Sequence, residues 1–131
     1  MNQRLGQIAL LVDDYDKALE FYTKKLNFKL IEDTPLSETK RWVVVEPAGG
    51  ESGARLLLAK ADSDEQRSRI GNQTGGRVFL FLYTTNCLKD HAHLVSQGIK
   101  IVRGPDTTPY GTVLVFEDIY GNQWDLIERN K

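Results

Sequence analysis

Near its C-terminus the chain reads VFEDIYGNQWDLIE, residues 115–128, and this stretch carries the strongest local signal in the sequence. Two runs of apolar, β-preferring residues flank Asp118 and the pair Gly121-Asn122. Gly adopts positive φ without steric cost, and Asp or Asn can bond to its own nearby backbone, so the stretch predicts a β-hairpin. Asp125 lies between two large apolar residues on the returning strand. Its carboxylate therefore either points to water or lines a site.

The order of elements before the hairpin occurs twice, as one strand, one helix and three strands. Asp13 or Asp14 is available as the N-cap of the first helix, and Asn27 suits its C-terminus. Between the two halves, residues 62–70 predict a short exposed helix. The first half predicts strands at 7–12, 28–33, 41–46 and 55–59 and a helix at 15–26, and the second predicts strands at 77–82, 99–103, 112–116 and 123–128 and a helix from Asn86 to Gly98.

This repeat predicts an α+β fold of two tandem βαβββ modules, in which curved antiparallel sheets are arranged around a cleft. Residues 1–60 are expected to form the first module and residues 76–131 the second. Residues 61–75 form the connector between them, because their second half is rich in glycine. The chain is long enough for the two modules to bury a core as one domain.

Aligning the two halves places Gln7 over Arg77 and Leu57 over Asp125. These four positions are expected to line the cleft together, since equivalent positions of both modules face it. Alternation along the strand puts Phe79 and Phe81 on the face of Arg77. An aromatic-lined cleft with a few polar groups is typical of a small-molecule site. The aromatic candidates on the strands are Trp42, Phe79, Phe81, Tyr83, Tyr110, Phe116 and Trp124.

Composition narrows the classes of partner. The chain has 17 Lys and Arg against 18 Asp and Glu without a run of one sign, which argues against nucleic acid or an anionic membrane. It has no apolar run of the roughly 20 residues that span a bilayer and no signal-type apolar stretch, so a cytoplasmic protein is expected. The single Cys87 excludes an internal disulfide. His91 and His93 are two apart on a helix and cannot chelate together.

Two motifs at opposite ends of the repeat resemble the vicinal oxygen chelate superfamily. They are VDDYDKALEFY at 12–22, followed by LNF at 26–28, and FEDIYGNQWDL at 116–126. That superfamily contains glyoxalase I, extradiol dioxygenases, fosfomycin resistance enzymes and bleomycin resistance proteins. The resemblance covers nearly the whole chain and implies the paired-module fold and a homodimer. It leaves the activity open, because the superfamily includes several chemistries and some proteins that only bind.

Metal enzymes of this superfamily draw four ligands from strand positions that fall here on Gln7, Leu57, Arg77 and Asp125. Leu57 has no donor atom, and Arg77 would place a permanent positive charge where the cation should lie. A firm site needs about three or four protein ligands. No metal or other cofactor is therefore expected, with a divalent metal as the alternative. An extradiol dioxygenase is disfavoured, since its iron site of two histidines and one carboxylate has no counterpart.

The same four positions predict an ion pair between Arg77 and Asp125 in the aromatic cleft, because each charge would need the other in a partly dry site. Such a site suits an anionic or oxygen-rich small molecule, with Arg41 and Arg103 as further cationic candidates. The alternative is that the pair only holds the sheets together. The predicted ligand-binding residues are Arg77, Asp125, Gln7, Arg41, Trp42, Phe79, Phe81, Tyr110 and Trp124.

Two functions follow from this site. The first is a metal-independent small-molecule binder similar to bleomycin resistance proteins, whose clefts form in a dimer. The second is a lyase or isomerase of the glyoxalase type, either with a degenerate metal site or free of metal. Glu117 and Tyr110 are the weaker catalytic candidates for the second function, beside Asp125.

Overall fold

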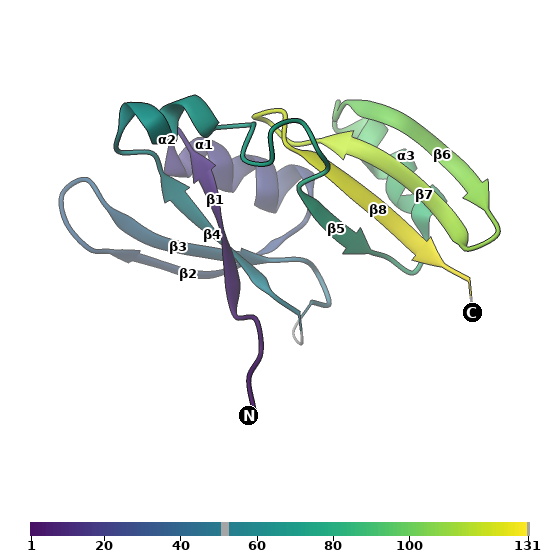
Figure 1. The fold of residues 1–131 in the computed structure, drawn as a ribbon, viewed down its shortest axis with the longest axis horizontal. Coiled ribbons are helices and arrows are strands. Elements are labelled where there is room, and N and C mark those ends of the chain that lie inside the picture. Colours follow the sequence, from purple (N-terminus) through teal and green to yellow (C-terminus); the bar gives the residue numbers. More distant parts are fainter. Residues whose placement is uncertain (51–52, 131) are drawn as a thin grey trace. The chain divides into compact units, whose positions relative to one another are not determined.

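The computed structural model describes residues 1–50 and 53–130, and the chain divides into two compact units, residues 1–70 and 71–131. Unit 1 contains a four-stranded sheet in the order β1-β4-β3-β2 (Figure 1). The strand β1 pairs with β4 in parallel, and the other neighbours are antiparallel. The elements of unit 1 are β1 (Gln7–Val12), α1 (Tyr15–Leu19), the π-helical turn η1 (Glu20–Lys25), β2 (Lys29–Pro35), β3 (Arg41–Glu46), β4 (Arg55–Lys60) and α2 (Asp64–Arg69).

Unit 2 repeats this arrangement with a sheet in the order β5-β8-β7-β6. Again the first strand pairs in parallel, here with β8. The helix α3 packs on β6, β7 and β8, and in Figure 1 it lies behind their sheet. The elements of unit 2 are β5 (Leu80–Tyr83), α3 (Cys87–Ser96), β6 (Ile101–Thr108), β7 (Gly111–Glu117) and β8 (Gln123–Arg129).

The two βαβββ modules and the α+β class are confirmed, but the sheets are mixed rather than antiparallel throughout. The reason lies in the chain path. In each unit the helix returns the chain after the first strand, so the second strand runs in the same direction as the first. Two antiparallel turns follow, and the last strand therefore runs parallel to the first. The short helix expected at 62–70 is present as α2.

Local side-chain chemistry explains where the helices begin and end. Of the two candidate N-caps, Asp14 is the one used, since its carboxylate accepts a hydrogen bond from the Lys17 amide at 2.9 Å. Asn27 has φ of 60°, the left-handed conformation expected after a helix. At the start of α3, Asn86 caps the Lys89 amide, and Glu128 of β8 accepts from the Cys87 amide at 2.8 Å. This last bond ties the helix to the sheet of unit 2.

The core of each unit lies on the helix-covered face of its sheet. In unit 1, Tyr22 and Phe28 pack with ring centroids 5.4 Å apart near the fully buried Leu10 and Leu58. In unit 2, the rings of Phe116 and Trp124 stack with centroids 6.0 Å apart. Burying such side chains contributes about 1.5–3 kcal/mol each. We call the opposite face of each sheet its open face.

The pairing of the strands changes the alignment of the two halves of the chain: the first strand of unit 2 shifts by two residues from the alignment made on the sequence. In unit 1, Leu57 pairs with Ala9, and in unit 2 the corresponding Asp125 pairs with Phe81. The equivalent of Gln7 is thus Phe79 rather than Arg77. The helix caps agree, because Asp14 lies five residues after Ala9 and Asn86 lies five residues after Phe81.

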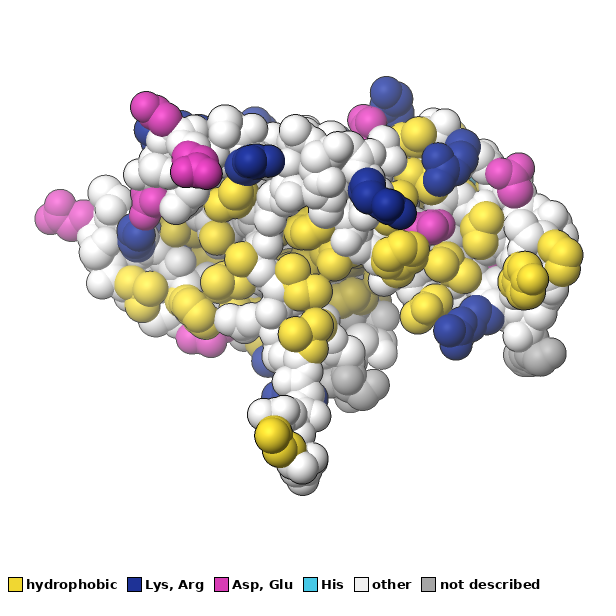
Figure 2. All heavy atoms as spheres, in the orientation of Figure 1, with side chains coloured by type: hydrophobic (Ala, Val, Ile, Leu, Met, Phe, Trp, Pro, Cys, Tyr) yellow, Lys and Arg dark blue, Asp and Glu magenta, His cyan; other side chains and the backbone are white. Residues whose placement is uncertain are grey.

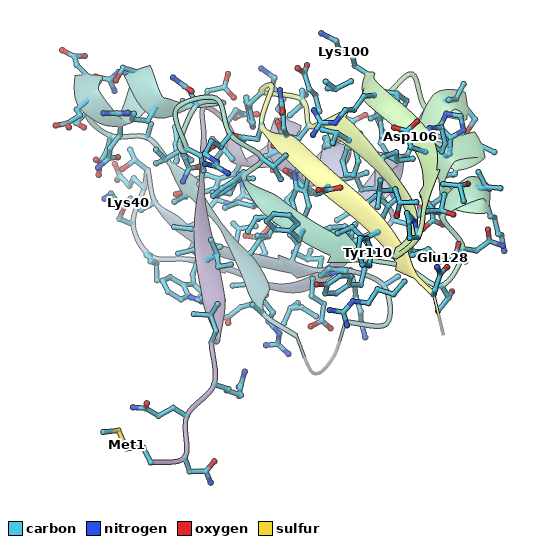
Figure 3. The ribbon with its side chains drawn as sticks, turned by 45° about the vertical axis from the view of Figure 1, so that its right-hand side comes forward. Met1, Lys40, Lys100, Asp106, Tyr110 and Glu128 are labelled. Atoms are coloured by element: carbon cyan, nitrogen blue, oxygen red, sulfur yellow. The ribbon has the colours of Figure 1, made fainter. Side chains whose placement is uncertain are left out.

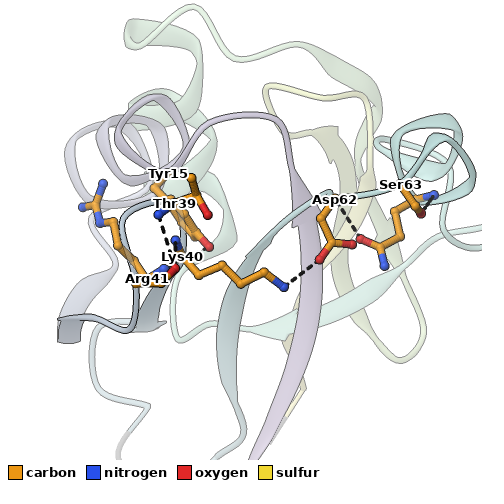
Figure 4. A network of polar contacts seen from close by, with 8 residues as sticks. Tyr15, Thr39, Lys40, Arg41, Asp62 and Ser63 are labelled. Carbon is orange, nitrogen blue, oxygen red and sulfur yellow. Dashed lines mark hydrogen bonds and ion pairs between the residues drawn. The ribbon is translucent and has the colours of Figure 1, made fainter.

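Arg41 joins the beginning of β3 to α1 and β2 in unit 1. Figure 4 shows its backbone beside Tyr15 of α1, whose hydroxyl accepts a hydrogen bond from the Arg41 amide at 3.2 Å. Its guanidinium donates to both carboxylate oxygens of Asp33 at 3.1 and 2.7 Å and to Asp16 at 3.0 Å. It also lies over the Tyr15 ring at 5.1 Å. Arg41 shares the helix-covered face with the buried Val43, so it lies away from the open face where a ligand contact was expected.

This network makes the protein sensitive to acid. The hydrogen bond from Arg41 holds the pKa of Asp33 below its ordinary value, although desolvation opposes the shift. Because the folded pKa is lowered, the stabilisation is present above the unfolded pKa of about 3.9 and is lost as pH falls through the folded pKa. We expect R41Q to cost about 1 kcal/mol of unfolding free energy at neutral pH. That difference should shrink toward zero as urea titrations are repeated below pH about 4. A cost that did not change with pH would contradict this role.

Among residues 1–50 and 53–130, none of the helices has the length and apolar character needed to cross a membrane.

Candidate functional site

The open face of the unit 2 sheet carries a mixed row of side chains. Phe81 pairs with Asp125, Asp125 with Val115, and Val115 with Arg103. Directly paired residues project to the same side of a sheet, so these four side chains share one face. It is the face opposite Trp124, which is buried beneath α3. Figure 2 shows hydrophobic side chains gathered over β5 to β8, with acidic and basic side chains among them.

Asp125 is the polar centre of this row. Within the described part of the chain, its carboxylate makes no hydrogen bond and no ion pair within 4.0 Å. Desolvation raises the pKa of Asp125, and the positive charge of Arg103 partly offsets this. A half-buried carboxyl without a protein partner lacks the interactions that usually accompany burial. Asp125 is thus free to accept a hydrogen bond from a bound molecule.

Aromatic side chains border Asp125 on the edge strand β5. Phe81 and Tyr83 are each 60% exposed, which is high for rings on a strand. The Arg129 guanidinium lies 4.6 Å above the Tyr83 ring centre and its Nη2 is 3.4 Å from the Tyr83 hydroxyl. This contact holds the Tyr83 ring beside the row. The expected placement of Phe81 on the open face agrees with this exposure.

Two expected members of the site lie elsewhere. Arg77 precedes β5 by three residues, in a bend, and no ion pair joins it to Asp125 among the described residues. The cation whose charge acts on Asp125 is Arg103, two strands away across Val115. Trp124 is only 3% exposed and stacks on Phe116, so it belongs to the core.

The four family ligand positions do not fit a metal ion. Unit 1 contributes Gln7 and Leu57, and unit 2 contributes Phe79 and Asp125 after the register correction. Each unit thus offers one side chain with a donor atom where the superfamily draws two. Among the described residues, no group of three or more His, Cys, Asp and Glu side chains is placed to hold a metal ion.

The weaker catalytic candidates are spread over unit 2. Glu117 lies 3.8 Å from Lys100 Nζ near the start of β6. Tyr110 is 85% exposed in the turn at the other end of that strand (Figure 3). Cys87 is buried at the start of α3, where desolvation, helped by the charge of Glu128, raises the pKa of its thiol to about 11. The thiol therefore stays protonated at neutral pH and is a poor nucleophile.

On unit 1, Trp42 lies on the open face beside Thr34 of β2 and is half-buried. Gln7 lies on the same face, paired with Arg55. Sequence reasoning missed Arg55 and its buried partner Glu46, whose carboxylate accepts from Arg55 Nε at 3.0 Å. The available signal was spacing, because Arg55 lies two residues before Leu57 and therefore on its face.

Tandem βαβββ units define the vicinal oxygen chelate fold. The chain belongs to the Glyoxalase/Bleomycin resistance protein/Dioxygenase superfamily, whose family model matches residues 4–126. An uncharacterized protein of Shewanella frigidimarina (strain NCIMB 400) is 55% identical over 131 residues, with 99% of this chain and 96% of that protein covered.

Solved structures of the same fold include two close in shape. The crystal structure of UcmS2 has a TM-score of 0.83 at 30% identity and covers 97% of this chain and 98% of its own. TnmS3, an antibiotic binding protein from Streptomyces sp. CB03234, has a TM-score of 0.78 at 27% identity, with 98% of both chains covered.

Proposed function

We propose that the protein is a metal-independent small-molecule binder that holds its ligand on the open face of β5 to β8. The observation that carries this proposal is Asp125, a half-buried carboxyl without a partner among the described residues, beside exposed aromatic rings. The similarity to TnmS3, an antibiotic binding protein, supports binding over catalysis. The homodimer and the cytoplasmic location stay predictions.

The row of side chains indicates the chemistry of the ligand. Asp125 accepts hydrogen bonds, Arg103 donates them, and the rings of Phe81 and Tyr83 offer apolar surface. An oxygen-rich ring system supplies hydroxyl donors for Asp125 and carbonyl or anionic oxygens for Arg103. Arg103 thus replaces Arg77 as the proposed cationic contact of the ligand.

Metal independence is supported by the chemistry of the family ligand positions. Leu57 and Phe79 carry no donor atoms, so two of the four ligand positions cannot bind a metal ion. The lyase or isomerase alternative would have to work from Asp125, Glu117 or Tyr110. Glu117 lies beside Lys100, and Tyr110 is almost fully exposed. No contact of either residue therefore favours the lyase or isomerase alternative.

The experiment combines a ligand screen with the variant D125N. Aromatic antibiotics and polyphenols are screened by thermal shift in the presence of EDTA, and hits are measured by calorimetry. We expect D125N to weaken binding of a hit by about tenfold or more, because a hydrogen bond to a charged acceptor contributes about 1.5–3 kcal/mol. The control D64N removes an equal charge from the exposed surface of α2 and should leave Kd unchanged.

The stability of D125N provides a second readout. Because the folded pKa of Asp125 is raised, its contribution to stability is greatest below the unfolded pKa and falls as pH rises through the folded value. The Tm of D125N should equal or exceed that of the natural protein at neutral pH. Hits that bind D125N unchanged would overturn the proposal, as would compounds that bind only when EDTA is left out and a divalent metal ion is added.

A further inference from the structure

A second polar pair lies on the open face of the unit 1 sheet. Glu46 is only 3% exposed, and its carboxylate accepts a hydrogen bond from Arg55 Nε at 3.0 Å. The Arg55 side chain is 42% exposed. An ion pair with one buried and one exposed partner contributes little net stability. Stabilisation of the fold alone therefore does not explain the pair.

Glu46 fixes the direction of the Arg55 guanidinium by occupying its Nε. The two Nη groups of Arg55 make no hydrogen bond or ion pair with any described residue. Four N–H donors in a rigid plane thus remain available. A carboxylate matches such a fork with two parallel hydrogen bonds.

The surroundings of Arg55 specify the rest of the ligand. Gln7 flanks Arg55 in the next strand, and its amide makes no hydrogen bond with a described side chain. One step along the same face lies an apolar row formed by Ala9, Leu57 and Val44. Two residues along a strand span about 6.6 Å, so a ring bound through its carboxylate to Arg55 reaches over Leu57.

We propose that Arg55, oriented by Glu46, is a binding site for the carboxylate of an aromatic acid. The guanidinium binds the carboxylate, Gln7 donates a further hydrogen bond, and the ring covers Leu57. This site lies wholly in unit 1, so it does not depend on the function proposed for Asp125.

The test uses 2-naphthoate as probe, with neutral 2-naphthylmethanol and 2-naphthyl phosphate for comparison. Binding is followed by NMR shifts of the Arg55 Nε–H and Trp42 indole signals. We expect 2-naphthoate to bind at least about tenfold more tightly than the alcohol, since charge-assisted hydrogen bonds are the stronger ones. Binding should weaken as salt is raised.

Three variants locate the site. R55Q should abolish the preference for 2-naphthoate over the alcohol. Because R55Q leaves Glu46 buried without its partner, E46Q/R55Q serves as the variant that removes both charges and keeps the fold. R67Q, which removes an exposed arginine from α2, is the matched control and should bind as the natural protein does.

The outcomes separate the possibilities. Loss of the preference in E46Q/R55Q, with D125N and R67Q unaffected, supports the proposal whether or not the Asp125 function holds. Equal binding of 2-naphthoate and the alcohol would overturn it, as would an undiminished preference in E46Q/R55Q. Tighter binding of the phosphate than of 2-naphthoate would overturn the assignment to a carboxylate.

Discussion

Replacing Gly111 by alanine is expected to destabilise the protein by about 3 kcal/mol or more. Gly111 begins β7 with φ of 153°, and a Cβ there would lie 2.0 Å from the carbonyl oxygen of Glu128. That oxygen belongs to the backbone of β8, so it cannot turn aside as a side chain would. The substitution therefore forces β7 away from the strand that carries Asp125.

The measurement is urea unfolding of G111A beside the control G98A. Gly98 also has positive φ, 71°, but an added Cβ meets nothing within 4 Å. G98A should cost only the left-handed strain, about 1–2 kcal/mol. Equal losses in the two variants would show that the close approach of β7 and β8 at Gly111 has no energetic weight.

The second large effect is expected for Asp118, which organises the turn between β7 and β8. Asp118 is buried, and its Oδ1 accepts from the amides of Tyr120 and Asn122, both at 2.9 Å. Its Oδ2 accepts from the Asn122 side chain at 2.9 Å. D118A removes three acceptor contacts and leaves buried donors unsatisfied. We expect a loss of about 2–4 kcal/mol in unfolding free energy.

D118N tests whether hydrogen bonding is the cause. An asparagine retains one acceptor for the two amides but turns an NH2 group toward the Asn122 side chain, so its loss should lie between zero and that of D118A. The exposed control D64A should change stability by less than about 0.5 kcal/mol. If D118A were as mild as D64A, the turn would be held by its backbone alone.

Much of the fold is predictable from local patterns. The strands β1 and β3 have the expected bounds, Asn86 caps α3, and Asp118 with Gly121 forms the predicted turn. These features depend on residues close in sequence, and capping and turn chemistry act over that range. Asp125 was found for a similar reason, because a carboxylate between Trp124 and Leu126 interrupts an otherwise apolar strand.

That Arg77 does not lie beside Asp125 was not predictable in this way. Arg77 and Phe79 are two residues apart, and a slip of two residues keeps every side chain on its own face. The alternating pattern is therefore blind to that slip, and Arg77 was placed where Phe79 lies. Only the hydrogen-bonded register, with Phe81 beside Asp125, removes the ambiguity.

By itself, then, the sequence determined the repeated βαβββ order, the caps, the turns and the family, because each rests on neighbouring residues or on a motif. The tertiary structure decided which charges share a face. It joined Arg103 to the row of Asp125 across Val115, placed Arg41 in a network with Asp33, and bound Arg55 to a buried Glu46. Such pairings depend on the register between strands far apart in the chain, and that register is set by packing and hydrogen bonds throughout a sheet.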